Sequence, residues 1–232
     1  LLDDQGAGSW DLLYIGLFTF VFLGLIRLTL GNKRGVNWYS MLHSIVTGLG
    51  GAVCLYLDFM ASESLTGVKE PLRSVQCFGP LTSLHRILPA ITMGYSIMDI
   101  LDGLTISLDF FLHGIATFTL MGVFVLVDTP HLVAPFLIME VSTPFLALVK
   151  ADFLPPILAQ MNLGCFALSF FVCRIIVSPY FWAELMRSMW HERNEMECFP
   201  SWFPLFCFCF GMFFNILNMY WFRKIVRKLK RK

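Results

Sequence analysis

Long apolar segments alternate with short polar or proline-containing stretches along this chain. A helix crosses the hydrocarbon core of a bilayer with about 20 apolar residues. On that basis we predict membrane-spanning helices at residues 10–30, 38–58, 87–106, 108–127, 131–149, 154–181 and 202–222. Residues 60–86 and 184–201 are expected to be the longest polar loops. The pattern therefore predicts an all-α integral membrane protein with about seven transmembrane helices.

Composition supports the membrane assignment. The chain has 232 residues, of which 57% are hydrophobic and only 14% are charged, whereas soluble domains carry about 25% charged residues. The formal net charge is +1, which gives no basis for nucleic-acid binding. Membrane lipids are therefore the expected partners.

The placement of Lys and Arg predicts the orientation. If seven helices cross the membrane, Lys33, Arg34, Lys150 and the basic run at 223–232 all fall on one side. Basic residues concentrate in cytosolic loops, so we expect a cytosolic C-terminus and an N-terminus on the opposite side. The last five residues, KLKRK, fit the K-x-K-x-x pattern of endoplasmic-reticulum retrieval signals. The endoplasmic reticulum is the expected location, with another organelle membrane as the alternative.

Two cysteines lie in the predicted non-cytosolic loops. Cys77 and Cys198 form a disulfide if that side is oxidising. Two free thiols are the equally weighted alternative, because the sequence gives no distance between them.

Ionisable residues interrupt the apolar pattern of the third predicted helix. Tyr95, Asp99 and Asp102 follow an i, i+4, i+7 spacing, which places them on one helical face. An ionisable group at mid-membrane costs roughly 2.5–3.5 kcal/mol on insertion scales. We therefore expect this face to border a shared polar cavity rather than lipid.

Histidines occur in two neighbouring apolar helices. His113 lies in the fourth predicted helix and His43 in the second. A neutral imidazole in such a place is either a general base or a hydrogen-bonded structural group, and both interpretations stay open. No H-x-x-x-H or H-E-x-x-H spacing occurs around them, so we predict no metal site.

Two further charges lie inside predicted helices. Glu140 precedes Pro144, which kinks a helix and frees backbone carbonyls that Ser142 or Thr143 can satisfy. Arg174 stays charged at any accessible pH, so it needs a partner. Pairing with one of the buried acids is expected, and binding of an anionic headgroup or a coenzyme phosphate is the alternative.

Five segments occur in the order typical of one known family. They are WYSMLHS around His43, GYSIMDILD around Tyr95 and Asp99, FFLHG around His113, MEVSTPFLAL around Glu140, and ILNMYWFRKIV, which ends at Val226. With these segments the chain resembles the TLC-domain family, named for the TRAM, LAG and CLN8 proteins. The form MEVSTPFL is most similar to the TLCD branch, and within it to the TLCD4-like proteins.

The resemblance implies three parts of the chain. Residues 1–32 are an N-terminal segment with a leading transmembrane helix, residues 33–228 are the TLC-like membrane domain, and residues 229–232 end a basic cytosolic tail. It also implies a helical bundle around a lipid-accessible cavity.

The resemblance leaves the enzyme question open. The ceramide synthases of this family join a fatty acyl-CoA to a sphingoid base, and they carry an adjacent His-His pair. Here His113 matches the first histidine, whereas Gly114 takes the place of the second. MEVSTPF also replaces their acidic segment. The chain therefore has only one of the two histidines that the resemblance associates with the base in sphingolipid synthesis.

The resulting hypothesis is a membrane protein that binds acyl lipid and influences membrane lipid composition or homeostasis without a cofactor. The first alternative is an acyltransferase that uses acyl-CoA. The second is a structural accessory subunit of a larger membrane complex, with membrane-protein partners. The candidate catalytic residues are His113, Asp99 and Asp102. The candidate lipid or substrate residues are His43, Tyr95, Glu140 and Arg174.

Overall fold

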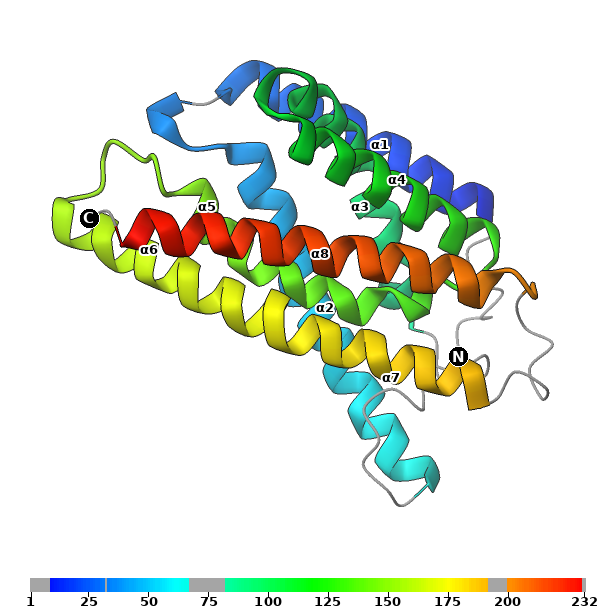
Figure 1. Cartoon of the computed structure of the whole chain (residues 1–232). Coiled ribbons are helices and arrows are strands. Elements are labelled where there is room, and N and C mark those ends of the chain that lie inside the picture. Colours follow the sequence, from blue (N-terminus) through cyan, green and yellow to red (C-terminus); the bar gives the residue numbers. More distant parts are fainter. Residues whose placement is uncertain (1–8, 32, 67–81, 192–199, 231–232) are drawn as a thin grey trace. The chain divides into compact units, whose positions relative to one another are not determined.

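The computed structural model describes residues 9–31, 33–66, 82–191 and 200–230 (Figure 1). Among these residues all regular structure is helical, and seven helical segments are long and apolar enough to cross a membrane. The predicted all-α membrane class is therefore confirmed. Cys77 and Cys198 lie outside the described residues.

The described chain divides into two compact units, each described by itself. The first unit contains Leu1–Leu25 and Gly50–Pro135. The second contains Ile26–Leu49 and Phe136–Lys232. Helices α1 (Ser9–Leu30) and α2 (Trp38–Thr66) contribute one part to each unit.

The first unit centres on a hairpin of two helices, α3 (Ser83–Ile106) and α4 (Leu108–Leu126). Ser107 joins them in an extended conformation, which ends one helix and starts the next. A short 3-10 turn, η3 (Pro130–Leu132), packs against α3. Leu12, Ala90 and Val125 form a fully buried apolar cluster that fixes α1 against the hairpin.

The second unit contains the C-terminal half of the chain. Its elements are η1 (Lys33–Gly35), η4 (Ala134–Ser142, from Phe136 onward), α5 (Thr143–Ala147), α6 (Pro156–Phe170), η5 (Phe171–Val177), α7 (Ser178–His191) and α8 (Phe203–Leu229). Figure 1 shows α8 alongside the continuous rod of α6, η5 and α7. Leu163, Phe166 and Phe170 form a buried cluster against the aromatic end of α8.

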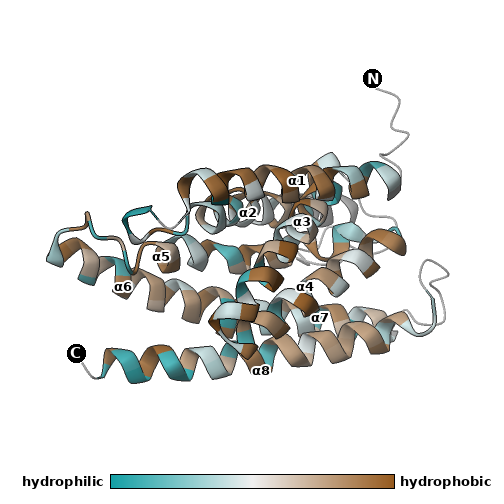
Figure 2. Cartoon of the chain, turned by 90° about the horizontal axis from the view of Figure 1, so that it is seen from above, coloured by the Kyte–Doolittle hydropathy of each residue, from teal (hydrophilic) through white to brown (hydrophobic). Residues whose placement is uncertain are grey.

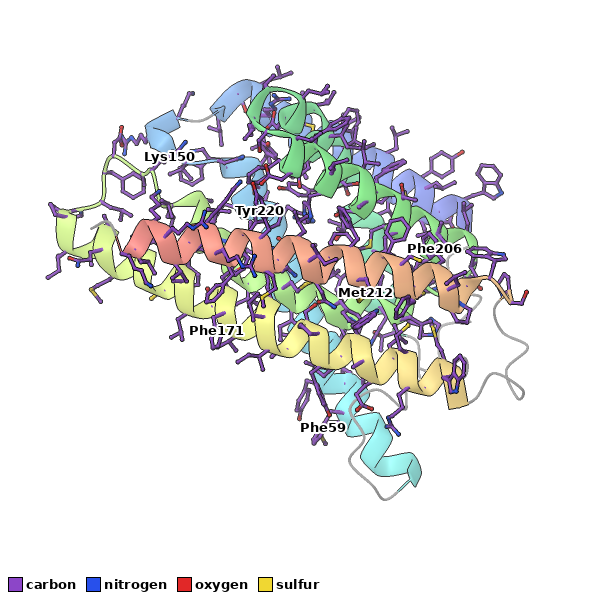
Figure 3. All side chains as sticks on the ribbon, in the orientation of Figure 1. Phe59, Lys150, Phe171, Phe206, Met212 and Tyr220 are labelled. Atoms are coloured by element: carbon purple, nitrogen blue, oxygen red, sulfur yellow. The ribbon has the colours of Figure 1, made fainter. Side chains whose placement is uncertain are left out.

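Apolar side chains cover much of the outer surface. Phe206, Met212 and Tyr220 are spaced along α8 (Figure 3), and on the same helix Leu205 is 67% and Ile216 is 64% exposed. Water would penalise this much exposed apolar area, and lipid does not. Along α8, Figure 2 shows the strongest hydrophilic colours at the C-terminal end. The surface therefore suits a bilayer, with a polar end outside it.

Several helices extend beyond the predicted limits. Helix α2 continues to Thr66 and α3 starts at Ser83, so the predicted loop at 60–86 is shorter. Residues 184–191 are helical instead of belonging to the loop predicted at 184–201. The basic segment after Phe222 continues α8 to Leu229. Hydropathy marks where a helix lies in the hydrocarbon, and a helix continues into water without changing its backbone.

Two elements depart from α-helical geometry. The segment Pro130–Ala147 consists mainly of the 3-10 helices η3 and η4, which contain Pro130 and Pro135. The rod Pro156–Trp190 contains the π-helical segment η5. Long 3-10 runs are uncommon, and π-helical turns occur frequently at functional sites. The next subsection shows which side chains these two elements carry.

Candidate functional site

The third and fourth transmembrane helices bring an acid and a histidine together. Nε2 of His113 on α4 lies 4.0 Å from Oδ2 of Asp99 on α3, and the two side chains are 17% and 18% exposed. Tyr95, one turn before Asp99, is buried, and Asp102, one turn after it, is partly exposed. An imidazole and a carboxylate each offer hydrogen-bonding atoms to a third polar group. The pair can therefore accept or donate a proton, or hydrogen bond to a polar headgroup.

Gly114 explains why the two helices come so close here. A Cβ at this position would lie 2.8 Å from the backbone nitrogen of Ile100 and 3.1 Å from the carbonyl carbon of Asp99. Both are backbone atoms, which cannot move aside as a flexible side chain can. Position 114, which corresponds to the second histidine in the resemblance to ceramide synthases, therefore lies at the contact between α4 and α3. A histidine side chain at position 114 does not fit this spacing.

The second unit contains a buried ion pair. Nη2 of Arg174 on η5 lies 3.0 Å from Oε1 of Glu140 on η4, and the side chains are 8% and 15% exposed. The same nitrogen donates to Oγ1 of Thr143 at 3.1 Å. Nε of Arg174 donates to Oγ of Ser142 at 3.1 Å and to the carbonyl oxygen of Met139 at 3.2 Å. The predicted pairing of Arg174 with a buried acid is confirmed.

Two polar side chains, Ser142 and Thr143, orient this ion pair. Oγ of Ser142 donates to the carbonyl oxygen of Met139 at 3.1 Å, which satisfies one carbonyl before the proline. Oγ1 of Thr143 instead donates to Oε2 of Glu140 at 2.8 Å. Both oxygens of Glu140 are thereby engaged. A guanidinium and a carboxylate that bind each other in this way suit a structural clasp better than a site for an incoming phosphate.

The first half of α2 packs against the same segment of η4. His43 is 3% exposed, and its imidazole interacts electrostatically with Glu140. A Cβ at Gly48 would lie 2.9 Å from the backbone nitrogen of Val141. The glycines of this helix therefore allow close helix packing. His43, Glu140 and Arg174 form one polar cluster, which we call the η4 cluster.

The candidate residues thus form two sets. Tyr95, Asp99, Asp102 and His113 belong to the first unit, and the η4 cluster belongs to the second. Sequence reasoning did not identify Gly48 as a packing position beside this cluster, although a small residue inside a long apolar helix is a signal of close packing. Among the described residues, no three His, Cys, Asp or Glu side chains are placed to hold a metal ion.

Comparisons with known proteins agree with this architecture. A model of the TLC domain matches residues 33–227. The Saccharomyces cerevisiae protein called "Topoisomerase I damage affected protein 4" is 31% identical over 105 residues. That alignment covers 41% of this chain and 37% of the yeast protein, so the matched part spans well under half of that relative. No solved structure matches the chain at a significant level.

The match covers most of both units. It includes His43, Asp99, His113, Glu140 and Arg174. The narrower assignment to the TLCD branch stays a prediction. Because the matched residues are far more than half of the chain, this protein belongs to the TLC-domain family.

Proposed function

We propose that this protein binds acyl lipid within the membrane and influences membrane lipid composition. The observation that carries the proposal is the pair of Asp99 and His113, two partly exposed polar groups on helices that cross the membrane. Polar groups at this depth are costly unless they serve a partner or a function. A lipid headgroup or ester drawn into a lipid-accessible cavity would contact both groups.

We assign a different role to the η4 cluster than to Asp99 and His113. Arg174 and Glu140 satisfy each other, and both are more buried than the pair on α3 and α4. We assign the η4 cluster to holding the bundle together, and Asp99 with His113 to contacting the lipid. Tyr95 and Asp102 lie on the same face of α3 and extend that contact surface.

A second candidate function is acyl transfer from acyl-CoA. The position of Asp99 beside His113 favours it, because a carboxylate near an imidazole orients a general base. Gly114 counts against synthase chemistry, because the packing leaves no space for a second histidine. Acyl-CoA would then be a substrate and not a resident cofactor.

We also propose an endoplasmic-reticulum location with a cytosolic C-terminus. The basic end of α8 and the K-x-K-x-x pattern support this orientation. The backbone nitrogen of Asp152 donates to the carbonyl oxygen of Arg34 at 3.1 Å, so the loops with Arg34 and Lys150 lie at one end of the second unit. These are the loops that the charge rule assigns to the cytosol.

Native mass spectrometry of gently solubilised protein, followed by lipid extraction, tests the binding. We expect one enriched acyl lipid in the wild type. In His113→Ala and Asp99→Asn its retention should fall by about tenfold or more, because each change removes a hydrogen bond to a charged group. Asp11→Asn, an exposed acid at the start of α1, is the matched control and should retain the lipid.

Two results would contradict this function. One is bulk membrane lipid without enrichment, and the other is equal retention by all four proteins. Incubation of the same proteins with acyl-CoA and a lipid amine distinguishes the second candidate. Product that disappears in His113→Ala would establish acyl transfer, whereas retention without product would establish binding alone.

A further inference from the structure

A second polar constellation lies in the first unit, away from Asp99 and His113. Nε2 of His85 lies 3.0 Å from Oδ1 of Asp58, and the two side chains are only 2% and 4% exposed. The other ring nitrogen, Nδ1, lies 2.7 Å from Oγ1 of Thr82. The three groups form a hydroxyl–imidazole–carboxylate chain. The sequence predicted no role for any of them.

This chain has the geometry of an activated nucleophile. In such sites a hydroxyl lies within about 2.6–3.2 Å of a base, and a third group orients the base. With Asp58 accepting from Nε2–H of His85, Nδ1 carries the lone pair that accepts the proton of Thr82. Because Asp58 and His85 are buried, the imidazole ring of His85 is held in one orientation. The side chain of Thr82 is partly exposed.

Thr82 also departs from the ordinary behaviour of its position. It is the N-cap of α3, where a threonine side chain usually accepts a hydrogen bond from the first turn. Here the side chain makes no capping hydrogen bond and is placed against His85. The first backbone N–H groups of a helix have no intrahelical partner. The N–H of His85 donates to the carbonyl oxygen of Thr82 at 3.0 Å. The N–H groups of Ser83 and Leu84 precede it in the first turn, next to the hydroxyl, and suit a developing oxyanion.

The depth of the constellation points to a substrate class. Asp58 lies two residues before the end of the span Lys33–Met60, and His85 is the third residue of the span Ser83–Ile106. Both residues thus lie near the ends of segments that are apolar enough to cross a membrane. We infer that the site is near the boundary between hydrocarbon and headgroups, which together make a bilayer about 40–45 Å thick. Acyl esters of membrane lipids have their carbonyl groups at this boundary.

We propose that Thr82, His85 and Asp58 form an acyl-ester hydrolysis site at the membrane boundary. This activity is separate from the lipid binding proposed above and uses other residues. Oγ1 of Thr82 bonds to the ester carbonyl carbon while its proton passes to Nδ1 of His85. The bond from that carbon to the leaving oxygen then breaks, and the leaving oxygen takes the proton. Water attacks the acyl-Thr82 ester through the same base, which releases the carboxylic acid and restores the hydroxyl.

The test uses the full chain in detergent with 4-nitrophenyl octanoate as the probe. We expect release of 4-nitrophenol and, after acid quenching, an octanoyl group on the peptide that contains Thr82. Thr82→Val should lower the release rate by about 100-fold or more, the scale of a lost general-base contact. His85→Gln and Asp58→Asn should also lower it, while Thr82→Ser retains both turnover and the adduct.

Thr92→Val is the matched control. Thr92 lies on the same helix, is 4% exposed and donates to the carbonyl oxygen of Leu88 at 3.0 Å, so the change removes a buried threonine hydroxyl outside the constellation. Its rate should equal that of the wild type. Wild-type release by Thr82→Val would overturn the proposal, as would a wild-type protein with neither turnover nor adduct.

Discussion

At the scale of single residues, the chain follows the rule that a buried charge needs a partner. Arg174 has no neutral form, so a buried acid was expected beside it, and Glu140 fills that role. The sequence did not identify which acid, because 34 residues separate the two. That choice depends on how η4 packs on η5, which hydropathy does not report.

Removing one partner of this ion pair should destabilise the protein strongly. Arg174→Ala leaves Glu140 buried and unpaired, which costs roughly 3–5 kcal/mol in comparable pairs. Arg187→Ala is the matched control, since Arg187 is 60% exposed and its pair with Glu184 lies at the surface. That change should cost at most about 1 kcal/mol. Thermal unfolding in one detergent measures both, and equal shifts in apparent Tm would contradict the assignment of a structural clasp.

The contact of Asp58 with His85 shows where residue-level prediction failed. His85 was placed in the predicted loop at 60–86, outside the membrane helices, so it was not considered with the intramembrane acids. In the structure α3 starts at Ser83, and His85 lies in its first turn. A single polar residue at the end of an apolar segment does not form a periodic pattern. The hydropathy of the sequence therefore does not indicate which residue it contacts.

At the scale of elements, hydropathy located the membrane segments well and their geometry poorly. Each predicted segment has a counterpart in the described chain, and the boundaries move by several residues. The 3-10 character of η4 and the π-helical turn of η5 were not predicted. Both depend on contacts with neighbouring helices, such as those of Arg174 with Met139 and Ser142, which have no local sequence signature.

The close approach of α3 and α4 can be tested at its glycine. Gly114→Ala places a methyl group 2.8 Å from the nitrogen of Ile100, and such overpacking costs about 1–3 kcal/mol. Gly164→Ala is the control, because a Cβ there meets nothing within 4 Å. That change should be neutral or stabilise α6 by roughly 0.5–1 kcal/mol. Thermal unfolding compares them, and a stabilised Gly114→Ala protein would exclude the tight crossing.

At the scale of the whole molecule, the basic loops give a testable orientation. Protease digestion of sealed microsomes should remove a tag placed after residue 232 and leave a tag placed before residue 1 intact. The expected result follows from the excess of Lys and Arg on the side of the C-terminus. Protection of the C-terminal tag until detergent is added would reverse the orientation. A tag within the loop at 31–37 would not serve as a control, because Gly35 packs tightly against Lys150.

The rod Pro156–Trp190 has 35 residues, or a length of about 52 Å at 1.5 Å per residue. The hydrocarbon core is only about 30 Å thick, and transmembrane helices tilt by at most about 40°. Even at that tilt the rod spans about 40 Å, so its end with Glu184 and Arg187 must reach the headgroup layer. A thinner bilayer would tilt the rod further and turn Arg174 with it. Bilayer thickness therefore sets how much of the rod lies within the hydrocarbon.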